Sequence, residues 1–311
     1  MRKLVVIGSS NTDMIIQVPH LPGPGETVLG GTFTTAAGGK GANQAVAAAR
    51  AGGSVSFIAA VGDDHFGQEA LAGFAKDNID TGLCMIDPIT PSGVAQIFVD
   101  AKGENTIGVA PGANAALEPG HIDRAAGLFG PDTVVLLQLE TPLETVGYAA
   151  KLAHDNGSTV ILNPAPAAEL DDELFQYVDY LTPNTTEAEL LTGMQVVDDT
   201  SASIAAELLL ARGLDNVLIT RAALGVYAAW RDEDDAIRTA TYPAFEVIAK
   251  DTTAAGDVFN GCLAVALSQE QNLEQAIRFA QAGAALSVQT LGAQISAPPL
   301  DAIQSVMNAN A

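Results

Sequence analysis

The decisive stretch of this chain is Asp251-Thr252-Thr253-Ala254-Ala255-Gly256-Asp257-Val258-Phe259-Asn260-Gly261, in which small residues precede an apolar helix expected to begin near Val258. Backbone N–H groups at a helix start lack partners within the helix, and the helix dipole adds partial positive charge there. Such a start binds anions, and here it contains Asp257. A carboxylate beside a phosphate cradle suits phosphoryl transfer to a hydroxyl, because it withdraws the alcohol proton while amides hold the moving charge.

Length and composition bound the fold class. The 311 residues, 48% of them hydrophobic, fit one large α/β domain or a domain with a smaller appendage. Apolar runs are too short for a membrane span, and Met1-Arg2-Lys3 leads straight into a strand-like run without a signal peptide. Cys84 and Cys262 lie among apolar residues, which predicts reduced thiols in a cytoplasmic protein and no zinc site.

The net charge restricts the partners. Fourteen basic and 37 acidic residues give a formal charge of −23, which excludes nucleic acid and anionic membranes because both require clustered Lys and Arg. High solubility accounts for the charge itself. Any phosphate site must therefore be built from local devices, such as helix starts, metal ions and a few cations.

Strand-like and helical patterns alternate along most of the chain. The expected strands are Leu4–Ile7, Val55–Val61, Val134–Leu139, Val160–Leu162, Tyr180–Leu181 and Val217–Thr220. The expected helices are Ala42–Ala51, Phe66–Asp77, Leu143–Asn156, Thr186–Thr192 and Ile204–Arg212. Continuous Val/Ile/Leu strands separated by amphipathic helices predict an α/β fold whose mostly parallel central sheet is covered by helices on both faces.

Four short strands without intervening helices break this alternation. They are Met14–Val18, Glu26–Thr35, Gly93–Asp100 and Asn105–Val109, the last two joined by the hairpin-turn sequence Ala101-Lys102-Gly103. They predict a small β-sheet that serves as a lid, a dimerisation surface, or both. We assign residues 11–37 and 92–111 to this lid and residues 1–10, 38–91 and 112–311 to the main domain. The acidic run 232–235 is expected to be a hairpin loop.

Two segments near the N-terminus are candidates for gripping a polyol. Asn11 and Asp13 follow the first strand, and ligands of parallel sheets gather beyond the carboxyl ends of strands. Gly38-Gly39-Lys40-Gly41-Ala42-Asn43-Gln44-Ala45 opens a helix, and its glycines allow close backbone approach while Lys40 and Asn43 can donate to hydroxyls. An Asx turn at the first segment and a tight strand–helix turn at the second are the alternatives.

Later strands also end in polar residues. Glu140 closes one strand, Asn163-Pro164-Ala165-Pro166 follows the next, and Asn184 and Glu187 follow a third at a helix start. Hard oxygen ligands suit Mg²⁺, which binds through one or two carboxylates and keeps several waters. A capping box between Asn184 and Glu187 is the competing interpretation.

Taken together, these segments resemble the ribokinase family of sugar kinases. The resemblance rests on Gly39-Lys40-Gly41-Ala42-Asn43-Gln44-Ala45, Asn163-Pro164-Ala165-Pro166-Ala167 and Ala254-Ala255-Gly256-Asp257, and it covers essentially the whole chain. It implies a ribokinase-like α/β domain with a β-sheet lid and a homodimer formed through the lids. It also implies ATP-dependent phosphorylation of D-ribose at the 5-hydroxyl, with Mg²⁺ accompanying ATP and K⁺ as a monovalent activator.

The resemblance further implies a role for each matching position, with Asp257 as the catalytic base. The sugar would be held by Asn11, Asp13, Gly39, Lys40, Gly41, Asn43, Glu140 and Asp257. The anion hole would comprise Ala254, Ala255 and Gly256, and Asn184 with Glu187 would organise Mg²⁺. The nucleotide would contact Asn184, Thr220, Ala222, Gly225, Ala255, Gly256 and Gln281. The positions matching the K⁺ site are Asp251, Thr253, Ser287, Thr290, Gly292 and Ser296.

One motif departs from the family pattern. Where the family usually shows T-x-G-x-x-G, this chain reads Thr220-Arg221-Ala222-Ala223-Leu224-Gly225. If the Ala222 position requires positive φ, its methyl group costs on the order of 1 kcal/mol and weakens ATP binding. This departure leaves a non-catalytic sugar-binding protein with a degraded nucleotide loop as one alternative. Among enzymes, the alternative to a ribose kinase is a kinase for deoxyribose or a nucleoside.

Overall fold

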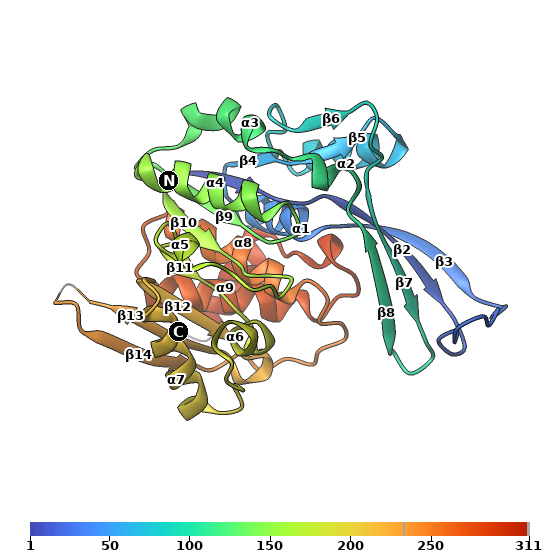
Figure 1. Cartoon of the computed structure of the whole chain (residues 1–311). Coiled ribbons are helices and arrows are strands. Elements are labelled where there is room, and N and C mark those ends of the chain that lie inside the picture. The colour runs from blue at the N-terminus through green and yellow to red at the C-terminus, as the bar shows by residue number, and fades with distance from the viewer. Residues whose placement is uncertain (233, 310–311) are drawn as a thin grey trace.

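The computed structural model describes residues 1–232 and 234–309; Glu233, within the acidic run expected to form a hairpin loop, lies outside them, as do residues 310 and 311. In these residues an eight-stranded sheet forms the centre of the molecule (Figure 1). Its strands, in spatial order, are β14 (Ile237–Tyr242), β13 (Val226–Arg231), β12 (Asn216–Thr220), β11 (Tyr180–Leu181), β10 (Thr159–Leu162), β9 (Thr133–Leu137), β1 (Lys3–Ile7) and β4 (Val55–Ile58). Pairing is parallel from β12 to β4, and β12–β13 and β13–β14 are antiparallel. The predicted mostly parallel sheet is confirmed.

Helices cover both faces of this sheet, as predicted. One face carries α1 (Lys40–Arg50), α2 (His65–Lys76), α8 (Ala255–Ser268), α9 (Leu273–Ser287) and α10 (Leu300–Ala309). The other carries α3 (Pro119–Ile122), α4 (Leu143–Asp155), α5 (Asp172–Phe175), α6 (Thr185–Thr192) and α7 (Asp199–Leu210). Short 3-10 turns are η1 (Gly112–Ala116), η2 (Asp123–Leu128), η3 (Ala222–Leu224) and η4 (Gln294–Ser296).

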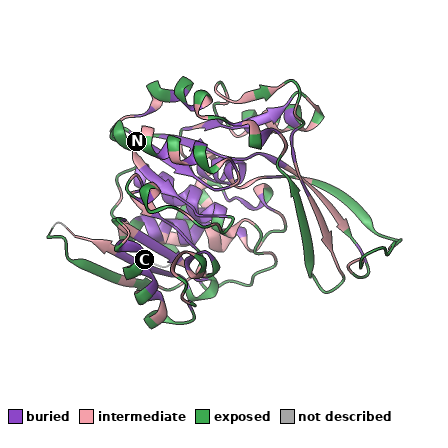
Figure 2. Cartoon of the chain, in the orientation of Figure 1, coloured by how far each residue is buried: buried purple, intermediate pink, exposed green. Residues whose placement is uncertain are grey.

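Alternation along the strands divides the core into two layers. Leu4 and Val6 of β1 pack toward α1 and α8, whereas Val5 and Ile7 pack toward α4. Successive side chains of a strand point to opposite faces, so a strand that is apolar at every position supplies both layers. Figure 2 shows these central elements buried, with exposed residues confined to the periphery and to the projecting strands.

The four projecting strands form a separate small sheet (Figure 1). Its spatial order is β3 (Thr32–Gly38), β2 (Asn11–Gln17), β7 (Gly93–Val99) and β8 (Asn105–Ala110), with β2 and β7 parallel. The predicted hairpin turn is present, because the Gly103 amide donates to Asp100 O and Gly103 has φ +85°. The small sheet is thus confirmed; its action as a lid stays a prediction.

Several strand boundaries were predicted wrongly: β2 begins at Asn11 instead of Met14, β9 ends at Leu137 instead of Leu139, and two further strands differ for reasons that the structure shows. The run from residue 55 to 61 is two strands, because the chain leaves the central sheet at Ala59 and continues as β5 (Ala60–Gly62), which pairs with β6 (Met85–Asp87). The strand expected from Glu26 begins only at Thr32. Gly25 and Gly30 both have positive φ, so the intervening backbone turns instead of extending.

Helices α1 and α8 approach one another closely at Gly261. A Cβ at this position would lie 2.6 Å from Gln44 O and 2.9 Å from Ala48 N. Only glycine fits such a contact, because backbone atoms cannot rotate away as a side chain can. This contact sets the start of α8 against the start of α1. None of the helices in the described residues is long and apolar enough to cross a bilayer.

We expect Gly261→Ala to lower the free energy of unfolding by about 1–3 kcal/mol, because the added methyl group overpacks this contact. The matched control is Gly147→Ala in the interior of α4, where a Cβ would meet open space. The free energy of unfolding of Gly147→Ala should rise by about 0.5–1 kcal/mol, because alanine is more favourable than glycine inside a helix. Thermal and denaturant unfolding measure both; equal stability of the two variants would contradict the packing argument.

Candidate active site

Asp257 lies in the first turn of α8 with its carboxylate buried and directed at α1. Asn43 Nδ2 donates to its Oδ2 at 2.9 Å, and Gln44 Nε2 donates to its Oδ1 at 2.9 Å. Burial raises the pKa of Asp257, as does Glu140, while Lys40 and the two amide donors act in the opposite direction. The carboxylate is therefore fixed in orientation by residues of the glycine-rich segment.

Asp13 lies near this carboxylate from the base of the small sheet. Burial raises its pKa to about 6, with further contributions from the Glu140 and Asp257 charges. Its carboxylate lies so close to Gly38 that a Cβ there would be 2.4 Å from it. The glycine-rich segment thus makes room for this acid, in addition to any approach by a ligand.

Glu140 lies at the N-terminus of α1. Its Oε2 accepts hydrogen bonds from Ser9 Oγ at 2.6 Å and from Lys40 N at 2.9 Å. A carboxylate is stabilised at a helix N-terminus by the free amides and the dipole. Gly39 and Gly41 pack against the chain itself, since a Cβ would lie 2.7 Å from Asn11 N and 2.5 Å from Ser9 N, respectively. The tight strand–helix turn of the alternative interpretation is present.

Two polar groups near the Asp257 carboxylate retain unused capacity. The buried Asn43 Oδ1 has no hydrogen-bond partner among residues 1–232 and 234–309. The Lys40 ammonium likewise forms no ion pair in the described chain, although its charge acts on Asp257 and Glu187. Asn11 is engaged with Asn114, whose Nδ2 donates to Asn11 Oδ1 at 2.8 Å. A free acceptor and a free cation suit a ligand that carries hydroxyl groups.

The start of α8 presents free amides. Ala254 precedes the helix in the left-handed conformation, with φ +59°, and the Ala255 amide donates to Thr252 O at 3.2 Å. The amides of Gly256 and Asp257 have no acceptor within the part of the chain that is described. The N-terminus of α8 therefore combines donors with the positive end of a 14-residue helix. The helix starts three residues earlier than predicted, which places Asp257 inside it.

Asn184 and Glu187 form the capping box of the alternative interpretation. Asn184 Oδ1 accepts from Glu187 N, and the Glu187 carboxylate accepts from both Asn184 N and Asn184 Nδ2, each at 2.8 Å. Burial raises the pKa of Glu187, which also senses the charges of Lys40 and Asp257. The acid thus lies near Lys40 and Asp257, and each of its oxygens keeps a lone pair for a further partner. In the described residues no cluster of three or more Asp, Glu, His or Cys side chains forms a complete metal site.

The proposed nucleotide loop follows β12. Thr220 bridges to Asn184, Ala222 has φ +49° and Gly225 has φ +87°. The Ala222 position therefore does require positive φ, as the departure from the family pattern suggested. Gln281, also expected at the nucleotide, uses its side chain within the protein: Nε2 donates to Tyr242 O at 2.7 Å and Oε1 accepts from Arg278.

Some of the residues expected to form a monovalent cation site come together. Asp251 Oδ2 accepts from Gly292 N at 2.8 Å, and Oδ1 accepts from Thr253 N at 2.9 Å. Burial opposes ionisation of Asp251, but these hydrogen bonds outweigh it and lower the pKa. Ser287 and Ser296 turn their hydroxyls to helical carbonyls, Ala284 O and Ala293 O. Thr290 N donates to Ser287 O.

Sequence reasoning missed two buried residues at this site. Gln44 contacts the Asp257 carboxylate, although it was noted only as part of a motif. Arg221 anchors the nucleotide loop: its buried Nη1 donates to Asp199 Oδ1 at 2.5 Å, and its amide donates to Gly225 O. A polar residue among the alanines of α1 was the available signal for Gln44.

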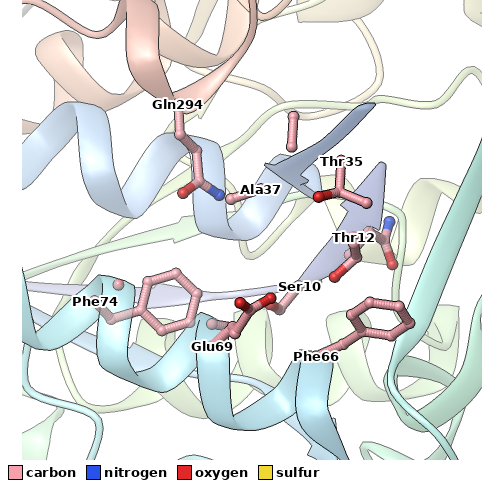
Figure 3. Close-up of a pocket in the computed structure, with 12 residues that line it drawn as sticks. Ser10, Thr12, Thr35, Ala37, Phe66, Glu69, Phe74 and Gln294 are labelled. Carbon is pink, nitrogen blue, oxygen red and sulfur yellow. The ribbon is translucent and has the colours of Figure 1, made fainter. Parts of the chain in front are cut away.

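A cavity of about 200 Å³ opens where the small sheet meets α2 (Figure 3). Ser10 and Thr12 line it from β2 and its approach, Phe66 and Glu69 from α2, and Gln294 from the opposite side. Its lining includes Asn11 but not Asp257. It borders Asn11, one of the residues expected to bind the sugar, without containing the Asp257 carboxylate. The hydrogen bonds at Asp257 therefore define the candidate site better than this cavity does.

Comparison with known proteins places this geometry in a family. The sequence profile of the pfkB family carbohydrate kinases matches residues 1–300. The chain belongs to the pfkB family. It is 45% identical to a ribokinase of Haemophilus influenzae over 299 residues, covering 96% of each chain. It is 40% identical to a deoxyribokinase of Salmonella typhimurium over 308 residues, covering 99% of each.

A solved structure extends the likeness to three dimensions. The ribokinase of Arabidopsis thaliana, complexed with ribose and ATP, matches with a TM-score of 0.92 and 30% identity, covering 98% of each chain. The ribokinase-like fold inferred from the sequence is confirmed, and this pfkB chain is an ATP-dependent sugar kinase.

We expect Asp13→Asn to raise Tm by about 2–4 °C at pH 8 relative to the parent. The folded state binds the Asp13 proton more tightly than the unfolded chain, so its stabilising contribution is complete below about pH 4 and is lost as the pH rises through about 6. Asparagine removes this loss, and the gain should shrink at pH 5. Thermal unfolding at both pH values measures it.

The control is Asp87→Asn. Amide hydrogen bonds from Thr90 and Ile89 lower the pKa of Asp87, so its contribution has the opposite sign, and this variant should lose stability at pH 8. A gain for Asp13→Asn that is the same at pH 5 and pH 8 would contradict the assignment.

Proposed function

We propose that this kinase transfers the γ-phosphoryl group of ATP to the 5-hydroxyl of D-ribose, producing D-ribose 5-phosphate and ADP. The observation that carries the proposal is the buried Asp257 carboxylate, held by Asn43 and Gln44 beside the free amides of α8. The ribokinase names of the relatives and the ribose and ATP of the Arabidopsis complex support the choice of substrates.

In the proposed reaction Asp257 acts as the general base. It accepts the proton of the 5-hydroxyl while that oxygen forms a bond to the γ-phosphorus, and the bond from the γ-phosphorus to the β–γ bridging oxygen breaks. ADP leaves with the electron pair of the broken bond. The amides of Gly256 and Asp257 hold the charge that develops on the phosphoryl oxygens, with Ala254 and Ala255 shaping the helix start.

The sugar would be gripped from two sides of this carboxylate. Asn43 Oδ1 offers a buried acceptor to a hydroxyl, and the Lys40 ammonium offers a donor. Asp13 and Glu140 supply acceptors from the small sheet and from the N-terminus of α1. The backbone of the segment that contains Asn11, Gly39 and Gly41 shapes the rest of this site.

A divalent ion, Mg²⁺ in our proposal, would balance the charge of the site. The carboxylates of Asp13, Glu140 and Glu187 lie near that of Asp257, and the Lys40 ammonium acts on Asp257 and Glu187, before ATP adds its own negative charge. The donor set fits an ion that keeps its waters, because Glu187 and Asn184 already bond one another and would hold the ion through water. When bound, such an ion neutralises the phosphates and lowers the barrier to transfer.

The nucleotide would extend from α8 toward the loop after β12. Thr220, Ala222 and Gly225 supply backbone at this loop, and Gln281 contributes from α9 by holding the neighbouring Tyr242 carbonyl. The positive φ of Ala222 makes the loop costly by about 1–2 kcal/mol. Arg221, which pairs with Asp199, anchors the loop.

Exposed apolar side chains on the small sheet support a homodimer formed through this surface. Phe33 is 60% exposed, Ile107 53% and Val109 54%, and each residue of β8 is exposed. Exposed apolar side chains on the two edge strands of this sheet, β3 and β8, favour pairing with a second copy.

The free thiols of Cys84 and Cys262 fit a reducing cytoplasm.

Deoxyribose is the second candidate substrate, because one relative over the whole chain is a deoxyribokinase. A site built to hydrogen-bond a hydroxyl rejects the analogue that lacks it. A coupled ADP-release assay with ribose, deoxyribose, adenosine and fructose tests the choice. We expect the highest kcat/KM for ribose. A higher kcat/KM for deoxyribose would show that deoxyribose, not ribose, is the substrate.

We expect Asp257→Asn to lower kcat by about 10²–10⁴-fold, because general-base assistance is lost, while ribose binding measured by calorimetry stays within a few-fold of the parent. The control is Asp179→Asn. Asp179 also has its pKa raised by burial, but its Oδ2 accepts from Val160 N at the other end of the sheet. Near-parental turnover by Asp257→Asn would refute the mechanism.

The proposed K⁺ site predicts activation by that ion. Activity should rise with K⁺, and Asp251→Asn should raise the half-activating concentration by about tenfold or more, because the carboxylate orients Thr253 and Gly292. Asp80→Asn is the matched control, since Asp80 makes the same type of turn with Gly82 N. Equal rates in K⁺, in Na⁺ and without a monovalent cation would dismiss the site.

A further inference from the structure

Gln44 contacts the proposed base Asp257 but, unlike its neighbour Asn43, leaves no polar atom free for the sugar. It follows Asn43 on α1, its side chain is fully buried, and its Nε2 donates to Asp257 Oδ1 at 2.9 Å. Asn43 keeps a free carbonyl oxygen for a ligand, whereas both ends of the Gln44 amide are engaged within the protein. Gln44 is therefore placed to act on the carboxylate alone.

A row of buried amides fixes which way Gln44 faces. Asn163 Nδ2 donates to Thr182 O at 3.2 Å, which directs Asn163 Oδ1 toward Gln44, and Gln44 Nε2 donates to that oxygen at 3.0 Å. The same Nε2 supplies its second hydrogen to Asp257. Gln44 Oε1 then faces Gln138, whose Nε2 donates to it at 2.7 Å. A rotated Gln44 amide would set its oxygen against the oxygens of Asn163 and Asp257.

This row derives from the parallel sheet. Gln138 follows β9, Asn163 follows β10 and Thr182 follows β11, so the carboxyl ends of three neighbouring strands meet α1. All three residues are buried. Low surrounding polarity strengthens hydrogen bonds in such a network and makes an unpaired member costly. Gln138 Oε1 lacks a partner among the described residues, so the bonds that Gln44 makes to Asn163 and Gln138 are what hold it as a donor.

We propose that Gln44 is a positioning residue for the base Asp257, locked as a hydrogen-bond donor by Asn163 and Gln138. The inference rests on the proposed function, since it assumes that the Asp257 carboxylate takes the proton of the substrate. Gln44 holds Oδ1, so the carboxylate plane is fixed, and it stabilises the ionised form that a base requires.

Other charges also act on Asp257, and they set the background for any pH dependence. They are Lys40 on α1, Glu140 after β9, Asp13 on the small sheet and Glu187 on α6. Burial raises the pKa of Asp257, and the amide of Gln44 opposes this rise. Removing the Gln44 donor therefore raises the pKa of Asp257 further. As the pH falls, the base then becomes protonated, and activity is lost, at a higher pH than in the parent.

The test is Gln44→Met, which keeps the length of the side chain and removes its donor. We expect kcat for ribose to fall about 10–100-fold, because hydrogen bonds to charged groups are among the stronger ones. The acidic limb of the kcat profile should shift to higher pH, while KM for ribose stays within about threefold. A parental kcat and pH profile, or a change in KM alone, would overturn the proposal.

Gln138→Leu supplies a second, independent variant that does not touch Asp257. It should lower kcat less than Gln44→Met does, with the same direction of the pH shift, and it should add nothing further in the Gln44→Met background. Additive losses would overturn the proposal, because the two residues would then act separately. Gln44→Glu, which preserves shape, should shift the acidic limb more strongly than Gln44→Met by placing a second carboxylate beside Oδ1. If Gln44→Met does not fold, these two variants decide the matter.

Thr145→Val is the control for loss of a buried hydrogen bond as such. Thr145 is buried on α4, and its Oγ1 donates to Leu117 O at 2.6 Å, away from the site. This variant should lose stability but keep the parental kcat profile. Parental protein and Asp257→Asn are assayed alongside: failure of the parent to phosphorylate ribose would refute the proposed function, whereas an active parent with unaffected Gln44 variants would refute only this inference.

Discussion

The site depends on the close contact between α1 and α8. Gly261 lets the two helices approach until backbone touches backbone, and this brings the residues at the start of α1 within hydrogen-bonding distance of Asp257 at the start of α8. From α1 come Asn43 and Gln44; from α8 come Asp257 and the free amides. The proposed proton acceptor and the proposed anion site are thereby held in one rigid arrangement, which is what transfer between a hydroxyl and a phosphate requires.

This arrangement opposes stability. Burial raises the pKa of Asp13, Glu187 and Asp257, so the folded protein holds acids where their charged forms are disfavoured. The positive ends of α1 and α8, the Lys40 ammonium and donated amide hydrogens offset part of this cost. In a chain with a net charge of −23, we propose that such local devices are the means of binding ATP. Backbone strain is also concentrated at the site and likewise opposes stability, because Ala222 and Ala254 adopt positive φ beside the proposed nucleotide site.

The sequence predicted the parts of this structure that depend on local pattern. Apolar runs predicted the parallel strands. Because the carboxyl ends of parallel strands share an edge of the sheet, the sequence also predicted that Glu140, Asn163 and Asn184 lie at the same edge. The break at Ala59 was not predictable, because an apolar run does not reveal when a strand changes partner. Gln44 was missed for a related reason: its neighbours in the sequence do not show which strand ends it faces. The alternative interpretation of Asn184 and Glu187 as a capping box is also correct, and a capping box is compatible with a position near Lys40 and Asp257.

The central claim is that the carboxylate held by α1 takes the proton of the sugar while the start of α8 receives the phosphate. A crystal structure with ribose and a non-hydrolysable ATP analogue tests it most directly. The account predicts the 5-hydroxyl within hydrogen-bonding distance of the Asp257 carboxylate and the γ-phosphate on the Gly256 and Asp257 amides. A ribose whose 5-hydroxyl is bound by another side chain, with Asp257 facing only Asn43 and Gln44, would contradict it.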